Sequence, residues 1–143
     1  MFWANTYQEY DNISIYVDAK PVTEGMNSYY GLLCRLQDKQ NFYYFVIRSN
    51  GDFKIGKYKN AEHQSLFLED WRRSDAIKQG NQTNRLEADC ATNTLRFYAN
   101  NVLLGEATDT DFISGFSGII AAALDAQGFE VVFNNFLITK SGQ

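Results

Sequence analysis

The stretch from Tyr29 to Trp71 constrains the fold most, because it breaks into short runs of alternating apolar and polar residues with turn residues between them. Side chains at every second position of a strand point to the same face of a sheet. Two inward faces are predicted on this basis: Tyr30, Leu32, Cys34 and Leu36 in one run, and Tyr43, Phe45 and Ile47 in the next. The polar residues 38–41 form the turn between these runs, and Asn50-Gly51 marks the following hairpin.

The same pattern continues toward the C-terminal end of the chain. Residues 85–90, 95–99, 102–107, 115–123 and 129–138 are predicted as strands, with a tight turn at Asn100-Asn101. Only residues 74–78 suggest a helical turn. Short strands at this spacing, without a long amphipathic helix, predict an all-β fold in which two antiparallel sheets pack as a β-sandwich.

Length and charge limit the classes of function. A chain of 143 residues is expected to form a single domain over 1–143 with a core of ordinary size. The formal net charge of −4, with both signs interspersed, argues against nucleic acid and anionic membrane surfaces as partners. No apolar run is long enough to predict insertion into a membrane.

The two cysteines, Cys34 and Cys90, both fall on the apolar phase of predicted strands. The favoured interpretation is a pair of small buried hydrophobic residues with free thiols. The alternative is a disulfide between strands, which would be useful only in an oxidising compartment.

Four segments carry a family resemblance: YYGLLCRLQDKQNFYYFVI with the following NGDFKIGK, LEDWRRSDAIKQGNQTNRLEADC, TLRFYANNVLLGEATDTDF, and GFEVVFNNFLI. From about Trp3 to Ile138, the chain resembles bacterial concanavalin A-like lectin/glucanase jelly rolls, which are related to laminin G-like modules. The resemblance implies a jelly roll of two antiparallel sheets, one of them concave, located outside the cell or on its surface.

The chain departs from this family in two places. Relatives usually carry at least one strand before the position of Met1. One alternative is therefore a sandwich that lacks an N-terminal strand. A missing strand would leave an open sheet edge that could pair with a second copy in a homodimer. Relatives also commonly have Asp where Asn134 stands, which weakens the calcium site that the resemblance implies.

Metal and catalytic sites have weak support in the sequence. Asp109 and Asp111 offer oxygen ligands for a structural calcium ion, although turn-capping aspartates are the commoner arrangement. We therefore expect either no cofactor or this calcium ion. The single histidine, His63, and two inward cysteines do not make a zinc set or a Cys/His nucleophile.

The glucanase branch of the fold needs an acid and a second carboxylate flanking the glycosidic bond. Glu87 and Asp89 share a strand face, but Ala91 and Thr92 stand where another glutamate would be required. The pair is predicted to belong to a solvated face, where Arg85, Arg96 and Lys59 neutralise it. We therefore expect no enzyme activity and keep a glucanase-type glycoside hydrolase as the less favoured alternative.

Carbohydrate binding needs only an aromatic platform and hydrogen-bonding groups. Arg35, Tyr44 and Arg48 fall on the strand face opposite the predicted core, and Trp71 offers a second platform beside polar neighbours. These four residues are the predicted ligand-binding set, with a glycan or a surface protein as the partner. The sequence thus favours a noncatalytic lectin-like module and leaves a protein-interaction or assembly domain as the alternative.

Overall fold

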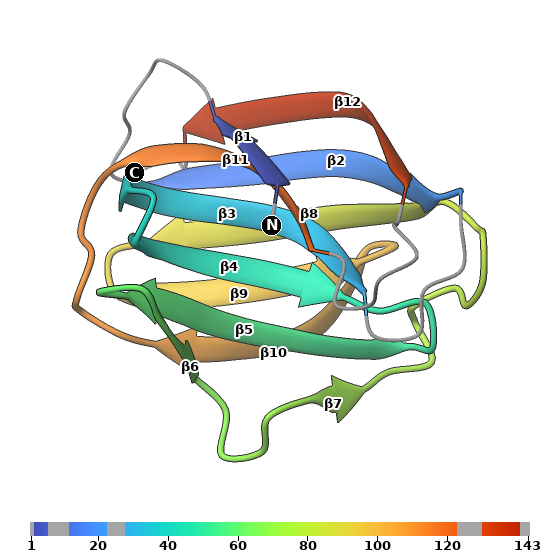
Figure 1. Cartoon of the computed structure of the whole chain (residues 1–143), viewed down its shortest axis with the longest axis horizontal. Helices are drawn as coiled ribbons and strands as arrows, with labels where there is room; N and C mark the ends of the chain where they lie inside the picture. The colour runs from blue at the N-terminus through green and yellow to red at the C-terminus, as the bar shows by residue number, and fades with distance from the viewer. Residues whose placement is uncertain (1, 6–11, 23–27, 123–129, 141–143) are drawn as a thin grey trace.

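The computed structural model describes residues 2–5, 12–22, 28–122 and 130–140, which form two antiparallel sheets stacked face to face (Figure 1). The strands are β1 (Phe2–Asn5), β2 (Ile13–Pro21), β3 (Tyr29–Asp38), β4 (Asn41–Ile47), β5 (Asp52–Lys59), β6 (Glu62–Ser65), β7 (Arg72–Arg73), β8 (Asn84–Ala91), β9 (Thr94–Ala99), β10 (Val102–Thr108), β11 (Phe116–Ala122) and β12 (Val131–Lys140). The predicted all-β jelly-roll sandwich is confirmed.

The front sheet in Figure 1 has seven strands in the order β1-β11-β3-β4-β5-β6, with β7 also paired to β5. The rear sheet has five strands in the order β10-β9-β8-β2-β12. Within the described part of the chain, no helix is long and apolar enough to cross a membrane.

The core between the sheets is built by alternation, as predicted. In β8 the buried and half-buried positions alternate strictly, and Leu86, Ala88 and Cys90 face inward. On the facing sheet Tyr30, Leu32 and Phe45 lie in the same core, each with none of its surface exposed. Edge-to-face contact between Phe45 and Phe97, with ring centroids 5.7 Å apart, joins the two sheets at the centre.

Strand β2 was missing from the sequence prediction, although its pattern is as regular as that of β8. Ile13, Ile15, Val17 and Ala19 are buried, and the residues between them are half-buried or exposed. The alternation was therefore readable in the sequence. The predicted helical turn at 74–78 is wrong: Ser74 forms a short turn there, in which its carbonyl accepts from Ile77 N (3.4 Å) and its Oγ accepts from Ala76 N (3.1 Å).

Two-residue hairpin turns appear where the chain can adopt positive φ. Asn100 and Asn101, at φ 54° and 69°, connect β9 to β10 and confirm the predicted tight turn. Asn60 and Ala61, at 51° and 65°, connect β5 to β6, which the sequence prediction did not include. Alanine at such a position is unusual, so this hairpin carried a weaker sequence signal.

A bulge in β3 changes which residues face the core. The register of β3 against β4 shifts between Cys34 and Asp38, and Arg35 has φ 53°. Leu36 was predicted to share the inward face with Cys34, but it lies in a second hydrophobic cluster on the outer side of the sheet. The extra residue reverses the phase of the alternation, which explains the error.

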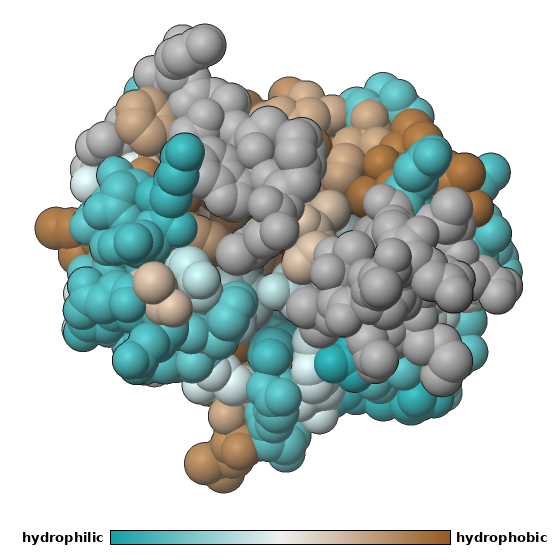
Figure 2. All heavy atoms as spheres, viewed as in Figure 1, coloured by the Kyte–Doolittle hydropathy of each residue, from teal (hydrophilic) through white to brown (hydrophobic). Residues whose placement is uncertain are grey.

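The surface seen in Figure 2 is hydrophilic over much of the described part of the seven-stranded sheet. One hydrophobic projection stands out at the lower edge, where Figure 1 draws the connection between β6 and β7. Leu68, which belongs to this connection, is fully exposed at 104%.

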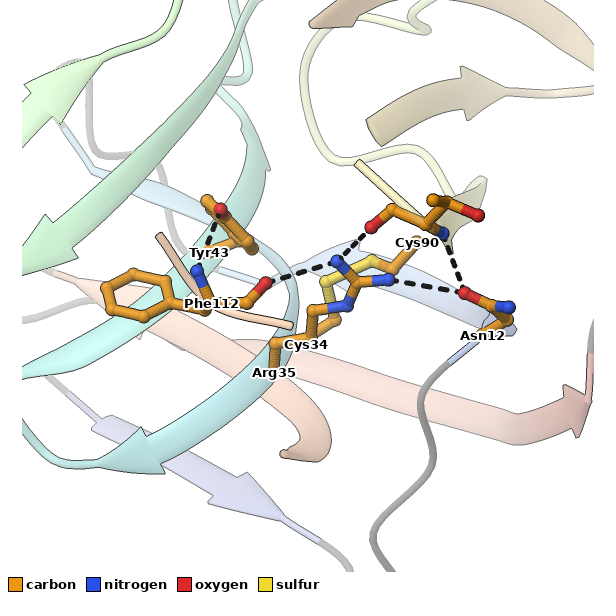
Figure 3. The surroundings of a disulfide bond; sticks show 7 residues. Asn12, Cys34, Arg35, Tyr43, Cys90 and Phe112 are labelled. Carbon is orange, nitrogen blue, oxygen red and sulfur yellow. Dashed lines mark hydrogen bonds between the residues drawn. A yellow bond between two sulfur atoms is a disulfide. The ribbon is translucent and has the colours of Figure 1, made fainter. Parts of the chain in front are cut away.

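Cys34 and Cys90 form a disulfide that ties β3 to β8 and therefore joins the two sheets (Figure 3). Both residues are fully buried, as predicted, but the favoured interpretation of two free thiols was wrong. Sequence alone could not decide between the two states, because the pairing of the two cysteines depends on how the sheets stack.

Candidate functional site

Among the ring-bearing side chains on the outer side of the seven-stranded sheet, we call six the aromatic face: Tyr29, Phe42, Tyr44, Tyr58, His63 and Trp71. They come from β3, β4, β5, β6 and the residue before β7. Consecutive hairpins place these strands side by side, so residues far apart in the sequence share one surface.

The aromatic face has a buried layer and an accessible rim. Phe42 and Tyr44 are buried, at 0% and 2% exposure, and pack with Leu33 and Val46. Tyr58 and Trp71 are half-buried. His63 is exposed, and its ring centroid lies 4.4 Å from that of Tyr58.

Tyr44 lies over Gly56 on the neighbouring strand, with which it is in register. A Cβ at Gly56 would stand 2.5 Å from the Tyr44 ring. The ring can therefore occupy this position only because residue 56 has no side chain. The Tyr44 hydroxyl lies 3.4 Å from His63 Nδ1, at hydrogen-bonding distance. The buried layer thus supports the histidine at the rim.

The Trp71 ring is surrounded by cations. The Arg48 guanidinium carbon lies 3.7 Å from the ring centroid and the Lys54 ammonium lies 4.5 Å from it. Asp52 pairs with Arg48 at 3.5 Å, and Asp70 pairs with Lys54 at 2.8 Å. The arrangement combines an aromatic surface with donors and acceptors, which are the groups that bind sugar hydroxyls.

The surroundings of His63 and Tyr44 shift the pKa values of both side chains. Packing against its neighbours removes water from the His63 ring and, together with the Lys54 ammonium, holds the pKa of His63 below its ordinary value. Burial raises the pKa of the Tyr44 hydroxyl well above its ordinary range. Both side chains are therefore neutral at pH 7, and the exposed His63 ring can exchange hydrogen bonds with an uncharged ligand.

Three of the four predicted ligand-binding residues share this surface. Arg48 and Trp71 contact each other at the rim, whereas Tyr44 lies beneath it and offers no open ring face. The sequence placed Tyr44 on the correct side of the sheet, but it could not show that Phe42, Tyr58 and His63 pack around it.

Arg35 does not belong to the aromatic face, which corrects the sequence prediction. The bulge directs its side chain into the end of the sandwich, where it is 1% exposed (Figure 3). Its Nη1 donates to the carbonyls of Thr92 and Phe112, at 2.5 and 3.1 Å, and its Nη2 donates to Asn12 Oδ1 at 3.4 Å. Arg35 therefore ties the β8–β9 turn and the segment after β10 to β3.

The two aspartates predicted as calcium ligands have protein partners. Lys57 pairs with Asp109 at 3.0 Å and also with Asp111, which Lys59 contacts at 3.2 Å. The Tyr43 hydroxyl donates to Asp109 Oδ2 at 2.7 Å. The Lys57 ammonium thus occupies the position at which a bound cation would contact the same oxygens. No group of three or more His, Cys, Asp or Glu residues that could hold a metal ion occurs among the described residues. The calcium ion stays a prediction.

The Glu87 and Asp89 side chains are neighbours on the outer side of the five-stranded sheet. Burial and the neighbouring Asp89 raise the pKa of Glu87 to about 7. The three cations predicted to neutralise this pair form ion pairs with other carboxylates instead: Arg85 with Asp18, Arg96 with Glu106, and Lys59 with Asp111. Carboxylates grouped on one strand face suit the glucanase branch of the fold, but Ala91 and Thr92 stand where its further glutamate would be required.

The sequence prediction missed Tyr58, His63 and Lys54 as site residues. Lys54, Gly56 and Tyr58 are spaced two apart in β5, so their common face could have been inferred. His63 could not, because its position depends on the hairpin at Asn60-Ala61.

Comparison with known proteins supports the fold. No protein-family model matches the sequence, and no curated protein matches it. Among solved structures, the carbohydrate-binding module CBM66 from Bacillus subtilis superposes with a TM-score of 0.80 at 16% identity, covering 97% of this chain and 81% of that one. Sheep galectin-11, in complex with glycerol, gives 0.68 at 9% identity, covering 96% of each chain.

An enzyme is also among the similar structures. Bacillus licheniformis β-glucanase superposes with a TM-score of 0.64 at 12% identity, covering 96% of this chain and 70% of that one. Identities this low establish a common fold and leave activity open. The chain therefore has the fold of the concanavalin A-like lectin/glucanase jelly rolls.

Proposed function

We propose that this chain is a noncatalytic, extracellular carbohydrate-binding module that contacts a glycan through the rim of the aromatic face. The observation that carries the proposal is the Trp71 platform, with Arg48, Lys54 and Asp70 around one ring and Tyr58 and His63 on the same sheet. The apolar face of a sugar ring can lie on such side chains while its hydroxyls bond to the charged groups.

Two further observations support this function. Solved structures of the same fold include a protein named as a carbohydrate-binding module and several named as galectins. The buried disulfide suits an oxidising compartment, since disulfides persist mainly in secreted and surface proteins. The lack of a further glutamate at Ala91 and Thr92, beside Glu87 and Asp89, supports a binding role over hydrolysis.

A glycan array on the whole chain tests the proposal, with Trp71→Ala and Tyr98→Ala variants beside it. Tyr98 is a half-buried tyrosine on the outer side of the other sheet and serves as the matched control. We expect Trp71→Ala to weaken binding at least about tenfold, with recovery in Trp71→Phe, and Tyr98→Ala to bind like the wild type. Equal binding by Trp71→Ala and the wild type would reject this site.

Catalysis is tested on any glycan that the array identifies. Prolonged incubation with the wild type should release no new reducing ends. If reducing ends appear and disappear again in Glu87→Gln, the chain is a glycoside hydrolase and the noncatalytic proposal fails.

An assembly role is the second candidate, and β12 favours it. This strand is the edge of the five-stranded sheet and exposes Phe136 and Leu137, at 38% and 49%. An edge strand with exposed apolar side chains can pair with a second copy. Light scattering tests this role: a dimer that becomes a monomer in Leu137→Lys would support it, and a monomeric wild type would reject it.

A further inference from the structure

A hollow with a volume of about 410 Å³ lies on the outer side of the five-stranded sheet, the sheet opposite the aromatic face. Its floor consists of two cross-strand pairs between β2 and β12: Asp18 with Asn134, and Lys20 with Val132. Val17 and Ala19 face the core, so the alternation of β2 points Asp18 and Lys20 outward. Asn81 and Thr83, which precede β8, form a wall.

The Asp18 carboxylate is held in place by two neighbours. Arg85 Nη1 donates to Oδ1 at 3.2 Å, and Asn135 Nδ2 donates to Oδ2 at 2.7 Å. Asn135 reaches Asp18 because β12 bulges between Asn134 and Leu137, where Asn135 adopts φ 58°. Bulges of this kind re-aim side chains and are frequent beside functional sites.

The wall is also fixed to the floor. Asn81 Nδ2 donates to the Val22 carbonyl at 3.4 Å, and Val22 N donates to the Glu130 carbonyl at 2.8 Å. These bonds connect the segment before β8 to the end of β2 and the start of β12. The hollow therefore has a defined shape, within the size range of small-ligand sites.

The charge balance of the hollow favours an anionic ligand. Arg85 compensates the Asp18 carboxylate, whereas Lys20 is exposed and forms no ion pair with any carboxylate of the described residues. The amides of Asn81 and Asn134 and the hydroxyl of Thr83 add further donors, and Asp18 can accept bonds from ligand hydroxyls. Pro21, Val22 and Val132 add apolar surface, but no aromatic ring lines the hollow among the described residues, so the polar contacts would orient a ligand here.

We propose that this hollow binds one acidic sugar residue of the uronate class, with the sugar carboxylate at Lys20 and its hydroxyls at Asp18, Asn134 and Thr83. The carboxylate of such a ligand can pair with the Lys20 ammonium, and its hydroxyl groups can form hydrogen bonds with the remaining polar side chains. The inference goes beyond the proposed function, because it uses the other sheet and shares no residue with the aromatic face.

Nuclear magnetic resonance titration of the whole chain tests the proposal, with D-glucuronate and D-galacturonate as probes. D-glucose, D-galactose and acetate are the matched controls for the hydroxyls and the charge. We expect amide shifts at residues 18–22, 81–83 and 132–135 with a dissociation constant on the order of 1 mM for a uronate. The neutral sugars and acetate should bind at least about tenfold more weakly.

Two variants locate the interaction. Lys20→Met should weaken uronate binding about tenfold, whereas Lys78→Met, an exposed lysine outside the hollow, should leave it unchanged. Thr83→Val keeps the volume and removes only the hydroxyl, so it should cause a smaller loss. Trp71→Ala should not alter the uronate response, which separates this test from that of the aromatic face.

Four results would overturn the proposal: no shift with either uronate, an equal response to neutral sugars, an equal response to acetate, or shifts confined to other parts of the chain. Unchanged binding in a folded Lys20→Met variant would also overturn it.

Discussion

The outer sides of the two sheets differ although both belong to one sandwich. On the seven-stranded sheet, β3 and β4 are buried on both sides, because Leu33, Phe42 and Val46 form a second hydrophobic cluster. On the five-stranded sheet, β8 and β9 alternate between core and surface, and their outer positions carry ion-paired and polar side chains.

The difference shows that a strand with apolar residues on both faces does not indicate which face binds a ligand. The sequence analysis placed Arg35, Tyr44 and Arg48 on the strand face opposite the predicted core, and we expected this face to bind a ligand. Most of that face is a packed layer, and only its rim is accessible. On the outer side of the five-stranded sheet, which we call the charged side, hydrogen-bonding groups surround a hollow instead.

The largest effect should come from separating the two sheets. Replacing both cysteines by alanine removes a crosslink across 56 residues, and we expect the free energy of unfolding to fall by about 4 kcal/mol. Urea unfolding followed by circular dichroism measures this change. Reductant should have no further effect on the variant, and a loss below about 1 kcal/mol would show that packing alone holds the sheets together.

A matched pair of truncations tests the contrast directly. Phe42→Ala removes a ring from the buried outer layer and should lower the free energy of unfolding by about 3 kcal/mol. Tyr98→Ala, on the outer side of the other sheet, should cost less than about 1 kcal/mol. Similar losses in urea titrations would contradict the distinction between a packed and a solvated side.

The carboxyl pair on the charged side should make stability depend on pH. The pKa of Glu87 is raised to about 7 in the folded chain from an ordinary 4.5, so the folded state binds the proton more tightly. This contribution is fully present below about pH 4.5 and is lost as the pH rises through about 7. Because Glu87 is half-buried and screened by water, we expect a loss of only about 1 kcal/mol.

Urea midpoints measured between pH 4.5 and 8 in the wild type and in Glu87→Gln check this dependence. The variant should lack the decline, whereas Glu106→Gln, which breaks a surface pair with Arg96, should retain it. An identical decline in Glu87→Gln would assign the effect to another group.

The smallest effect should come from that surface pair itself. Arg96 and Glu106 lie 3.4 Å apart with side chains 43% and 51% exposed, so Arg96→Met should change the free energy of unfolding by less than about 0.5 kcal/mol. A larger loss in urea titration would mean that the charged side contributes to stability as the buried outer layer does.

Many elements of the fold could be predicted from the local alternation of apolar and polar residues. The strands from β3 to β5 and from β8 to β12, the Asn100-Asn101 turn and the inward positions of Cys34 and Cys90 were all predicted from the residues alone. Each depends on side chains two positions apart or on adjacent turn residues, which interact within one short segment.

The tertiary structure decided the rest. The disulfide, the enclosure of Tyr44 and the hollow at Asp18 all join segments far apart in the sequence, and the bulge at Arg35 is a shift of register between two strands. Alternation reports only that a side chain lies on one side of its own strand. Which strand lies beside it, and what covers that side, depends on register and on the stacking of the sheets. A single extra residue in a strand moves the side chains that follow it to the other face.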